Sequence, residues 1–288
     1  MIDNEFLLFD RIEKIKQVIN KYGIENFYIS FSGGKDSTVL SNLVDLAIPN
    51  NAIPRVYANT GIELNMIRDF VLEMQKTDDR IVVIKPSVPI KQMLDKNGYP
   101  FKSKEHSLYL SEYQRMGEKS ACYNRYLFPS ENRKRYGCPK ILRYQFTKKF
   151  NIKISKKCCD ELKKKPIKNW AKENNKTFCI TGLIREEGGT RNNISCFNLK
   201  QKKFHPLAPV TKEWENWFID KYNIKICDIY KSPYNFERTG CKGCPFAIDL
   251  QKELDILEKY FPTERKQCEY IWKPVYNEYR RLKYRLKE

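Results

Sequence analysis

The sequence lacks any continuous apolar run long enough to cross a bilayer, so we expect no membrane-spanning helix. Its first residues also lack the basic block followed by an apolar block that is typical of a secretory signal peptide. We find no internal repeat and no low-complexity tract, which excludes solenoid and disordered classes. We therefore expect a soluble, cytoplasmic protein. Its 288 residues are enough for one large domain, alone or with an appendage.

The charge is strongly basic, with 54 Lys and Arg against 35 Asp and Glu and a net charge of +19. Such an excess favours a nucleic-acid partner. The lysines are spread over most of the chain and come with many Asn and Ile, a pattern that a biased source composition also produces. Charge alone therefore leaves nucleic acid open as a substrate or partner.

The stretch with the clearest chemistry is residues 27–40. Residues 27–31 form a short apolar run typical of a buried strand, and residues 37–44 predict the first turns of a helix. Glycines in the intervening turn let backbone N–H groups approach a ligand, and a helix N-terminus suits phosphate. The alternative is a Gly-Gly turn that only joins a strand to a helix. The candidate phosphate-binding residues are Ser30, Ser32, Gly33, Gly34, Lys35, Asp36, Ser37 and Thr38, with Asp36 the candidate Mg²⁺ ligand.

Alternation of strands and helices predicts an α/β fold: a doubly wound, mostly parallel sheet flanked by helices, with a helical insertion and a helical C-terminus. We expect strands at 27–31, 54–61, 80–85 and 178–182, and a short strand or loop at 225–230. Helices are expected at 5–22, 62–74, 112–128, 140–150, 249–260 and 265–286. Ligands of such sheets bind beyond the C-terminal strand ends. Residues 32–38, 59–61 and 182–185 lie at such ends, so one cleft is expected to collect them.

The chain is expected to divide near residue 248. Residues 1–248 would form the nucleotide-binding and catalytic domain, and residues 249–288 a C-terminal helical segment. A basic, tyrosine-rich insertion at about 87–150 belongs to the first of these, and residues 99–105 within it are expected to form a loop over the cleft.

Ten cysteines in a chain expected to be cytoplasmic indicate metal or redox chemistry rather than disulfides. Cys158 and Cys159 are adjacent, and Cys241 and Cys244 form a Cys-x-x-Cys turn loosened by glycines. Such a turn directs two thiolates at one metal or cluster. Adjacent thiols can both be ligands only of something larger than one small ion. Structural zinc and ordinary buried thiols are the alternatives.

The segment Ser32-Gly-Gly-Lys-Asp-Ser37 resembles the pyrophosphate loop, or PP-loop, of the ATP pyrophosphatases. With the two cysteine pairs, the chain resembles the phosphoadenosine phosphosulfate (PAPS) and adenylyl-sulfate reductase family, within the adenine nucleotide alpha hydrolase-like superfamily. This resemblance implies that ATP, or a sulfated adenine nucleotide, binds the loop with Mg²⁺. It also implies a 4Fe–4S cluster held by the four thiols named above.

Other segments extend the resemblance over about residues 25–250. Asn59-Thr60-Gly61 is similar to the family's Asp-Thr-Gly turn, with Asn in place of Asp. Residues 181–191, including Gly182, are similar to a Gly-x-Arg-x-x-Glu segment ending in Arg. Its arginines, Arg185 and Arg191, would neutralise the phosphoryl or sulfuryl group. Residues 204–214 are similar to a Pro-Leu stretch that leads into a helix.

Two departures separate the chain from the reductases. It lacks their C-terminal Glu-Cys-Gly-Leu-His tail, whose cysteine is the nucleophile. Its Lys35 and Asp36 are intact, as in the ATP-using tRNA thiolation enzymes and DNA phosphorothioation proteins. Conversely, four cysteines would close the cluster, as in the reductases, whereas thiolation enzymes leave one iron without a protein ligand. The remaining candidate reactive thiols are Cys268, Cys122 and Cys138; Cys179 is expected in the core, and Cys196 is a lesser candidate.

We therefore expect an enzyme that adenylates a nucleic acid (tRNA or DNA) or a small molecule and transfers sulfur to it. Its catalytic residues would be Lys35, Asp36, Arg185 and Arg191. One alternative is a sulfonucleotide reductase that releases sulfite with a thioredoxin-like donor. Another is a nucleotide- and cluster-binding accessory module for nucleic acid, without turnover. A cysteine-desulfurase partner and a homo-oligomer are further expectations.

Overall fold

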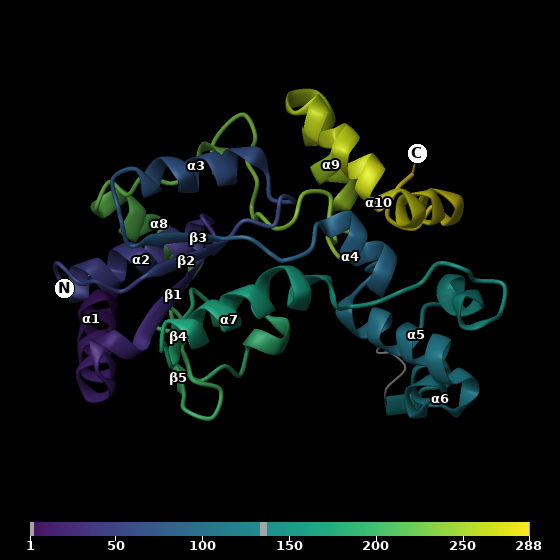
Figure 1. Ribbon diagram of the computed structural model, residues 1–288, viewed down its shortest axis with the longest axis horizontal. Coiled ribbons are helices and arrows are strands. Elements are labelled where there is room, and N and C mark those ends of the chain that lie inside the picture. Colours follow the sequence, from purple (N-terminus) through teal and green to yellow (C-terminus); the bar gives the residue numbers. More distant parts are fainter. Residues whose placement is uncertain (1–2, 133–136, 288) are drawn as a thin grey trace. The chain divides into compact units, whose positions relative to one another are not determined.

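The computed structural model describes residues 3–132 and 137–287, and within them it leaves the side chains of Cys122 and Thr190 undescribed. The chain forms two compact units, each made of segments that are distant in sequence (Figure 1). Unit 1 contains Met1–Asn59, Asn65–Lys85 and Lys165–Thr239. Unit 2 contains Thr60–Leu64, Pro86–Lys164 and Gly240–Glu288.

Unit 1 is built on a six-stranded sheet in the order β3-β2-β1-β4-β6-β5. Neighbouring strands pair in parallel, except that β5 runs antiparallel to β6. In the register, Ile29 of β1 lies opposite Arg55 on one side and Ile180 on the other. The strands are β1 (Phe27–Phe31), β2 (Arg55–Ala58), β3 (Ile81–Ile84), β4 (Phe178–Ile180), β5 (Phe197–Asn198) and β6 (Lys203–Phe204).

Helices cover both faces of this sheet. The larger core lies between the sheet and α1 (Asp3–Tyr22), α2 (Lys35–Ala47), α3 (Asn65–Gln75) and α8 (Lys212–Lys221). Helix α1 places Leu8, Ile15 and Ile19 at helical spacing, so one stripe of the helix is buried. On the opposite face, α7 (Lys165–Glu173) packs Ala171 against Tyr28 and Val56 (Figure 1). This is the expected doubly wound arrangement.

Unit 2 is mainly helical. It contains α4 (Ile90–Asn97), α5 (Lys104–Met116), α6 (Ala121–Leu127), α9 (Leu250–Tyr260) and α10 (Pro262–Leu282). The chain enters α5 through Ser103, whose side chain accepts a hydrogen bond from the His106 N–H and so caps the helix. Shorter turns lie at Lys140–Phe146 and Asp160–Lys164. None of the described helices is long and apolar enough to cross a membrane.

The predicted fold class is confirmed, and the four predicted parallel strands are present, the first with the predicted bounds and the other three shorter. At residues 225–230 the loop alternative is confirmed, because this segment holds only a 3-10 turn, Asp228–Tyr230. Three local predictions were wrong. The helix expected at 140–150 is a 3-10 helix, Lys140–Phe146. The helix expected at 112–128 is interrupted after Met116, because Gly117 adopts φ 62, a conformation that ends a helix. Residues 104 and 105, expected in a loop, already belong to α5. The sequence also failed to indicate α4 and the short β5–β6 hairpin.

Candidate functional site

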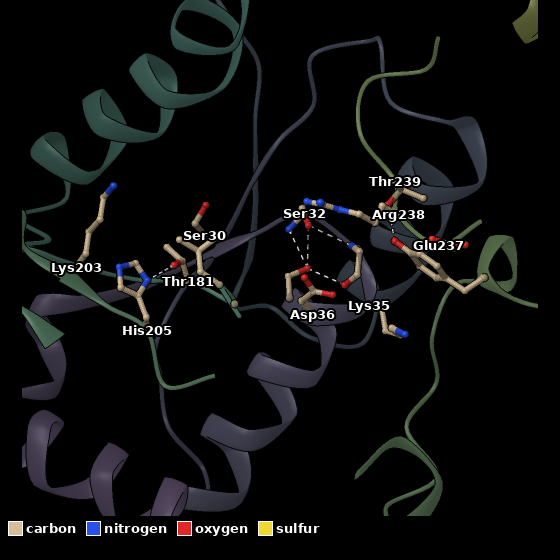
Figure 2. Close-up of a pocket in the computed structure, with 15 residues that line it drawn as sticks. Ser30, Ser32, Lys35, Asp36, Thr181, Lys203, His205, Glu237, Arg238 and Thr239 are labelled. Atoms are coloured by element: carbon tan, nitrogen blue, oxygen red, sulfur yellow. Dashed lines mark hydrogen bonds between the residues drawn. The ribbon is translucent and has the colours of Figure 1, made fainter. Parts of the chain in front are cut away.

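A cavity of about 350 Å³ opens in unit 1 around the C-terminal ends of β1 and β4. The turn after β1 contributes most of one wall (Figure 2). Parallel strands leave such a crevice beyond their carboxyl ends, so the position follows from the topology. The predicted nucleotide-binding residues that line it are Ser30, Ser32, Gly34, Lys35, Asp36, Ser37 and Gly182.

The turn itself is shaped by glycine and by its own hydroxyls. Gly33 has φ 71, and a Cβ there would lie 2.4 Å from Val71 Cγ2, so no other residue fits. The Ser37 hydroxyl donates to the Gly34 carbonyl at 2.9 Å, and the Thr38 hydroxyl donates to the same oxygen at 3.0 Å. Gly33 and Thr38 are therefore part of the loop's framework and do not line the cavity.

Two charged residues begin α2 at the cavity. The Lys35 ammonium donates to Asn216 Oδ1 of α8 at 3.4 Å, a weak contact that a phosphate could replace. Asp36 lies in the first turn of the helix, where the unpaired N–H groups and the helix dipole favour an anion. The start of α2 therefore favours both the Asp36 carboxylate and a phosphate, and a cation bound between these two anionic groups would bridge them.

The opposite part of the cavity contains a histidine that the sequence did not indicate. His205 Nδ1 lies 2.6 Å from the Thr181 hydroxyl, and both residues line the cavity with Lys203 (Figure 2). Burial, followed by the charge of Lys203, lowers the pKa of His205 to about 4. The imidazole is therefore neutral at physiological pH and offers a hydrogen bond rather than a charge.

A second segment missed from sequence closes the cavity with Glu237, Arg238 and Thr239, and the Tyr230 hydroxyl bonds to Thr239. The Arg238 guanidinium pairs with Glu187 Oε1 at 3.0 Å. Arg238 therefore adds a cation to the cavity lining, which also contains Lys35 and Lys203. No motif marked it, because residues 230–239 carry neither a helix pattern nor a strand pattern.

Other predicted site residues lie away from this lining. The exposed Arg185 donates to the Ile194 carbonyl at 2.9 Å, and Arg191 pairs with Glu187. Asn59, at the end of β2, donates its N–H to Ile84. Thr60 and Gly61 belong to unit 2, where the Thr60 hydroxyl donates to Glu63 Oε1 at 2.6 Å.

Glu215 of α8 is an anomaly next to the loop. Its side chain is buried, and neither carboxylate oxygen has a hydrogen-bond partner among the residues that the structure describes. Burial, followed by the negative charge of Asp36, raises the pKa of Glu215 to about 8. An unpartnered buried carboxylate is costly, so the group is held in its neutral form. A glutamate on an amphipathic helix gives no sequence signal of such burial.

All four predicted cluster ligands belong to unit 2. Their thiols interact electrostatically, because the charges of Cys159, Cys244 and Cys241 all raise the pKa of Cys158. A hydrogen bond from Cys158 lowers the pKa of Cys159 to about 6 and raises that of Cys158. Among the described residues, however, no group of three or more His, Cys, Asp or Glu is arranged to hold a metal ion.

The other candidate thiols are poorly suited to nucleophilic chemistry. Burial raises the pKa of Cys268 to about 12 and that of Cys138 to about 11, so neither is a thiolate at neutral pH. Burial likewise raises the pKa of Cys179, whose backbone belongs to β4 as expected. The side chain of Cys122 lies outside the described part of the chain.

Comparison with known proteins now decides the family. The model described as the phosphoadenosine phosphosulfate reductase domain matches residues 26–127 and 126–247. The chain belongs to the PAPS reductase family. This confirms the relationship inferred from the loop and the cysteine pairs. It places the PP-loop cavity and both cysteine pairs inside the matched region.

One curated relative, an uncharacterized protein of Methanocaldococcus jannaschii, is 24% identical over 294 residues. The alignment includes 92% of this chain but 58% of the relative, so the chain spans little more than half of that protein's length. What the longer protein does as a whole is therefore not carried over to this chain.

Three solved structures resemble the chain in fold. The PAPS reductase of Candida auris, in a phosphate complex, has 11% identity and a TM-score of 0.49 over 80% of this chain and 87% of that one. The NH3-dependent NAD synthetase of Campylobacter jejuni has 12% identity and a TM-score of 0.42 over 95% of each chain. The U34-tRNA thiolase of Methanococcus maripaludis, with its 4Fe–4S cluster, has 15% identity and a TM-score of 0.39 over 97% and 80%.

Proposed function

We propose that this member of the PAPS reductase family is an ATP-dependent iron–sulfur enzyme that adenylates an acceptor and transfers sulfur to it. The observation that carries the proposal is the lining of the unit 1 cavity. Lys35 and Asp36, both intact, face it together with Arg238 (Figure 2). A site that only binds a sulfated monophosphate needs less positive charge and no cation ligand.

In the proposed reaction, an acceptor oxygen attacks the α-phosphorus of ATP, the α–β bridging bond breaks, and pyrophosphate leaves. A sulfur nucleophile then displaces AMP from the activated acceptor. Lys35 and the loop's N–H groups would hold the departing phosphates, and Asp36 with Ser37 would position Mg²⁺. Arg238 adds a charge at the same cavity. Arg185 and Arg191 would neutralise the phosphoryl group as charge develops.

The four thiols fit an iron–sulfur cluster as a donor set. They are soft ligands, they interact within one unit, and an adjacent pair cannot close on one small ion. Cys158, Cys159, Cys241 and Cys244 would hold the cluster, which would supply electrostatic support or electrons when bound.

The charge distribution favours a nucleic acid as the acceptor. Unit 2 contains 30 of the 54 basic residues and 16 of the 35 acidic ones, a net charge of +14 out of +19. The insertion contributes exposed cations such as Lys140, Lys148 and Lys149. Because the excess is concentrated in one unit, a compositional bias of the whole chain does not explain it. Phosphate backbones are the partners that such a surface attracts.

One observation favours a second candidate, a sulfonucleotide reductase. Four cysteines in mutual electrostatic contact would occupy every iron of a cluster, as expected for the reductases. Against it, Cys268 is buried with a raised pKa, so the C-terminal segment provides no accessible thiolate. The two reactions can be told apart by their products, which are pyrophosphate and AMP for sulfur transfer and sulfite for the reductase.

The test uses anaerobically purified full-length protein with ATP, Mg²⁺ and RNA or DNA, and in parallel with adenylyl sulfate and reduced thioredoxin. We expect pyrophosphate and AMP in the first reaction and their loss in Lys35→Ala. Lys21→Ala, which changes an exposed lysine of α1, is the matched control. Sulfite in the second reaction, with the first silent, would instead establish the reductase. Nucleic-acid binding without either product would mean an accessory module.

A further inference from the structure

One face of α10 is buried and the opposite face is exposed. Buried side chains such as Trp272 and Tyr276 fix the helix within unit 2. Residues three or four positions apart on a helix lie on the same face. The exposed residues that follow this spacing form the α10 stripe, which consists of Lys266, Tyr270, Lys273 and Asn277. The stripe contains two cations, an aromatic ring and an amide, and no acidic residue.

The two lysines of the stripe keep their charge unneutralised. The acidic residues of the same helix all pair with other cations: Glu264 with Lys242, Glu269 with Arg265 and Arg280, and Glu278 with Arg281. Among the residues that the structure describes, neither Lys266 nor Lys273 has an ion-pair partner. Both ammonium groups are therefore available to an anionic ligand.

The tyrosine between them is the most exposed one in the described part of the chain. Tyr270 has 66% of its surface accessible. The ammonium of Lys91, on α4, lies 5.9 Å from the centre of its ring. This ammonium is held in place, because it donates to the Tyr99 hydroxyl at 2.6 Å and to Asp95 Oδ1 at 3.1 Å. An accessible ring with cations along one line matches the alternation of base and phosphate in a nucleic-acid strand.

This combination favours an unpaired strand over other anionic partners. In a duplex the faces of the bases are stacked on one another, so the Tyr270 ring could not reach them. Loops of folded RNA present unpaired bases, which proteins bind on aromatic side chains. An acidic polypeptide would use the lysines and leave the ring without a partner. A lipid surface would need several apolar residues on this face, and the α10 stripe has one aromatic.

We propose that the α10 stripe binds an unpaired RNA segment, with a base stacked on Tyr270 and phosphates held by Lys266 and Lys273. The amide of Asn277 adds a hydrogen-bond donor on the same line. The inference deepens the proposed function and rests on its nucleic-acid acceptor, for which it names the class and the surface. The net charge of +14 in unit 2 attracts the strand to that surface.

The experiment measures binding of a fluorescent single-stranded RNA to the full-length protein over a range of KCl concentrations, without ATP or Mg²⁺. Lys266→Gln/Lys273→Gln removes two phosphate contacts, so the slope of log affinity against log salt should fall in magnitude by roughly 1.4. Tyr270→Leu should lower the affinity about tenfold and leave the slope unchanged. Tyr270→Phe should bind as wild type, because stacking needs the ring and not the hydroxyl.

Two variants of unit 1 are the matched controls. Lys168→Gln/Lys172→Gln removes the same charge from exposed positions of α7. Phe9→Leu removes an aromatic ring that is 63% exposed on α1. Both should keep the wild-type slope and affinity. All the changes are at exposed positions, and melting temperatures equal to that of wild type check that each variant is folded.

The outcomes separate this inference from its foundation. Wild-type affinity and slope in Lys266→Gln/Lys273→Gln and Tyr270→Leu would overturn the stripe and leave the nucleic-acid acceptor intact. Equal losses in the control variants would mean diffuse attraction by charge and would also overturn it. Tighter binding of duplex RNA or of single-stranded DNA, or equal displacement by polyglutamate, would overturn the choice of unpaired RNA. Wild-type protein that binds no nucleic acid would overturn the proposed acceptor, and this inference with it.

Discussion

Gly182 and Asp36 approach each other so closely that a Cβ on Gly182 would lie 2.8 Å from the Asp36 carbonyl oxygen and 3.0 Å from its carbonyl carbon. The end of β4 and the start of α2 can meet in this way only because residue 182 has no side chain. The two segments are about 150 residues apart in sequence, and together they form one wall of the cavity. Their contact makes the turn after β1 part of a pocket.

Gly182→Ala should therefore damage both stability and nucleotide binding. The methyl group meets backbone atoms, which cannot rotate away, so we expect destabilisation by about 1–3 kcal/mol. Urea unfolding and fluorescence titration with an ATP analogue measure the two effects. Gly240→Ala is the matched control, because a Cβ there has nothing within 4 Å. Wild-type behaviour of Gly182→Ala would show that α2 shifts freely against β4.

Arg238→Ala should weaken nucleotide binding even though no motif includes this residue. The Arg238 side chain lines the cavity and is largely exposed, although its partner Glu187 is buried, so a phosphate can compete for the guanidinium. Loss of one charge-assisted bond predicts a Kd about tenfold higher. Isothermal titration with ATP and Mg²⁺ measures the change. Arg68→Ala, on α3 and paired with Asp69, is the control. Equal affinities in wild type and Arg238→Ala would remove Arg238 from the site.

Glu215→Gln should abolish part of the pH dependence of stability. The pKa of Glu215 is about 8 in the folded protein, against 4.5 for an ordinary glutamate, so the folded state retains the proton longer. Stability from this group is thus complete below about pH 4.5 and is lost as the pH rises towards 8. The loss at pH 7 is at most about 3 kcal/mol.

Urea unfolding of wild type and Glu215→Gln across this range tests the sign. The variant should gain stability relative to wild type as the pH rises. Glu213→Gln, at an exposed position of the same helix, should follow the wild-type curve. Parallel curves for wild type and Glu215→Gln would mean that the carboxyl finds a partner in solution.

The four proposed cysteine ligands should differ from the other buried thiols in how their loss affects metal content. Serine at Cys158, Cys159, Cys241 or Cys244 should lower iron and sulfide content after anaerobic reconstitution, because each removes one soft ligand. Cys268→Ser changes a fully buried thiol beside the same turn and should keep both. Zinc in place of iron, lost in the same four variants, would establish a structural metal instead. Full iron content in all four would exclude the ligand set.

The parts of the site that were predictable are those encoded by local sequence. The turn after β1 needs glycine where φ is positive, and it needs hydroxyls that bind a backbone carbonyl, so its residue types predict a tight turn between strand and helix. The Cys-x-x-Cys turn is equally local. Strand–helix alternation is periodic, which made the parallel sheet predictable before any contact was known. Short elements such as the β5–β6 hairpin carry too few residues to show a period.

What the sequence determined by itself is therefore the PP-loop, the cysteine pairs, the family and the parallel sheet, because each depends on neighbouring residues or on a period along the chain. Only the tertiary structure decided which distant side chains join them. Burial keeps Glu215 protonated and the His205 ring neutral. Packing places Arg238 in the lining of the cavity. A hydrogen bond from Tyr279 of α10 to the Pro245 carbonyl joins that helix to the cysteine turn. Burial and long-range contact depend on the whole fold, and no local pattern records them.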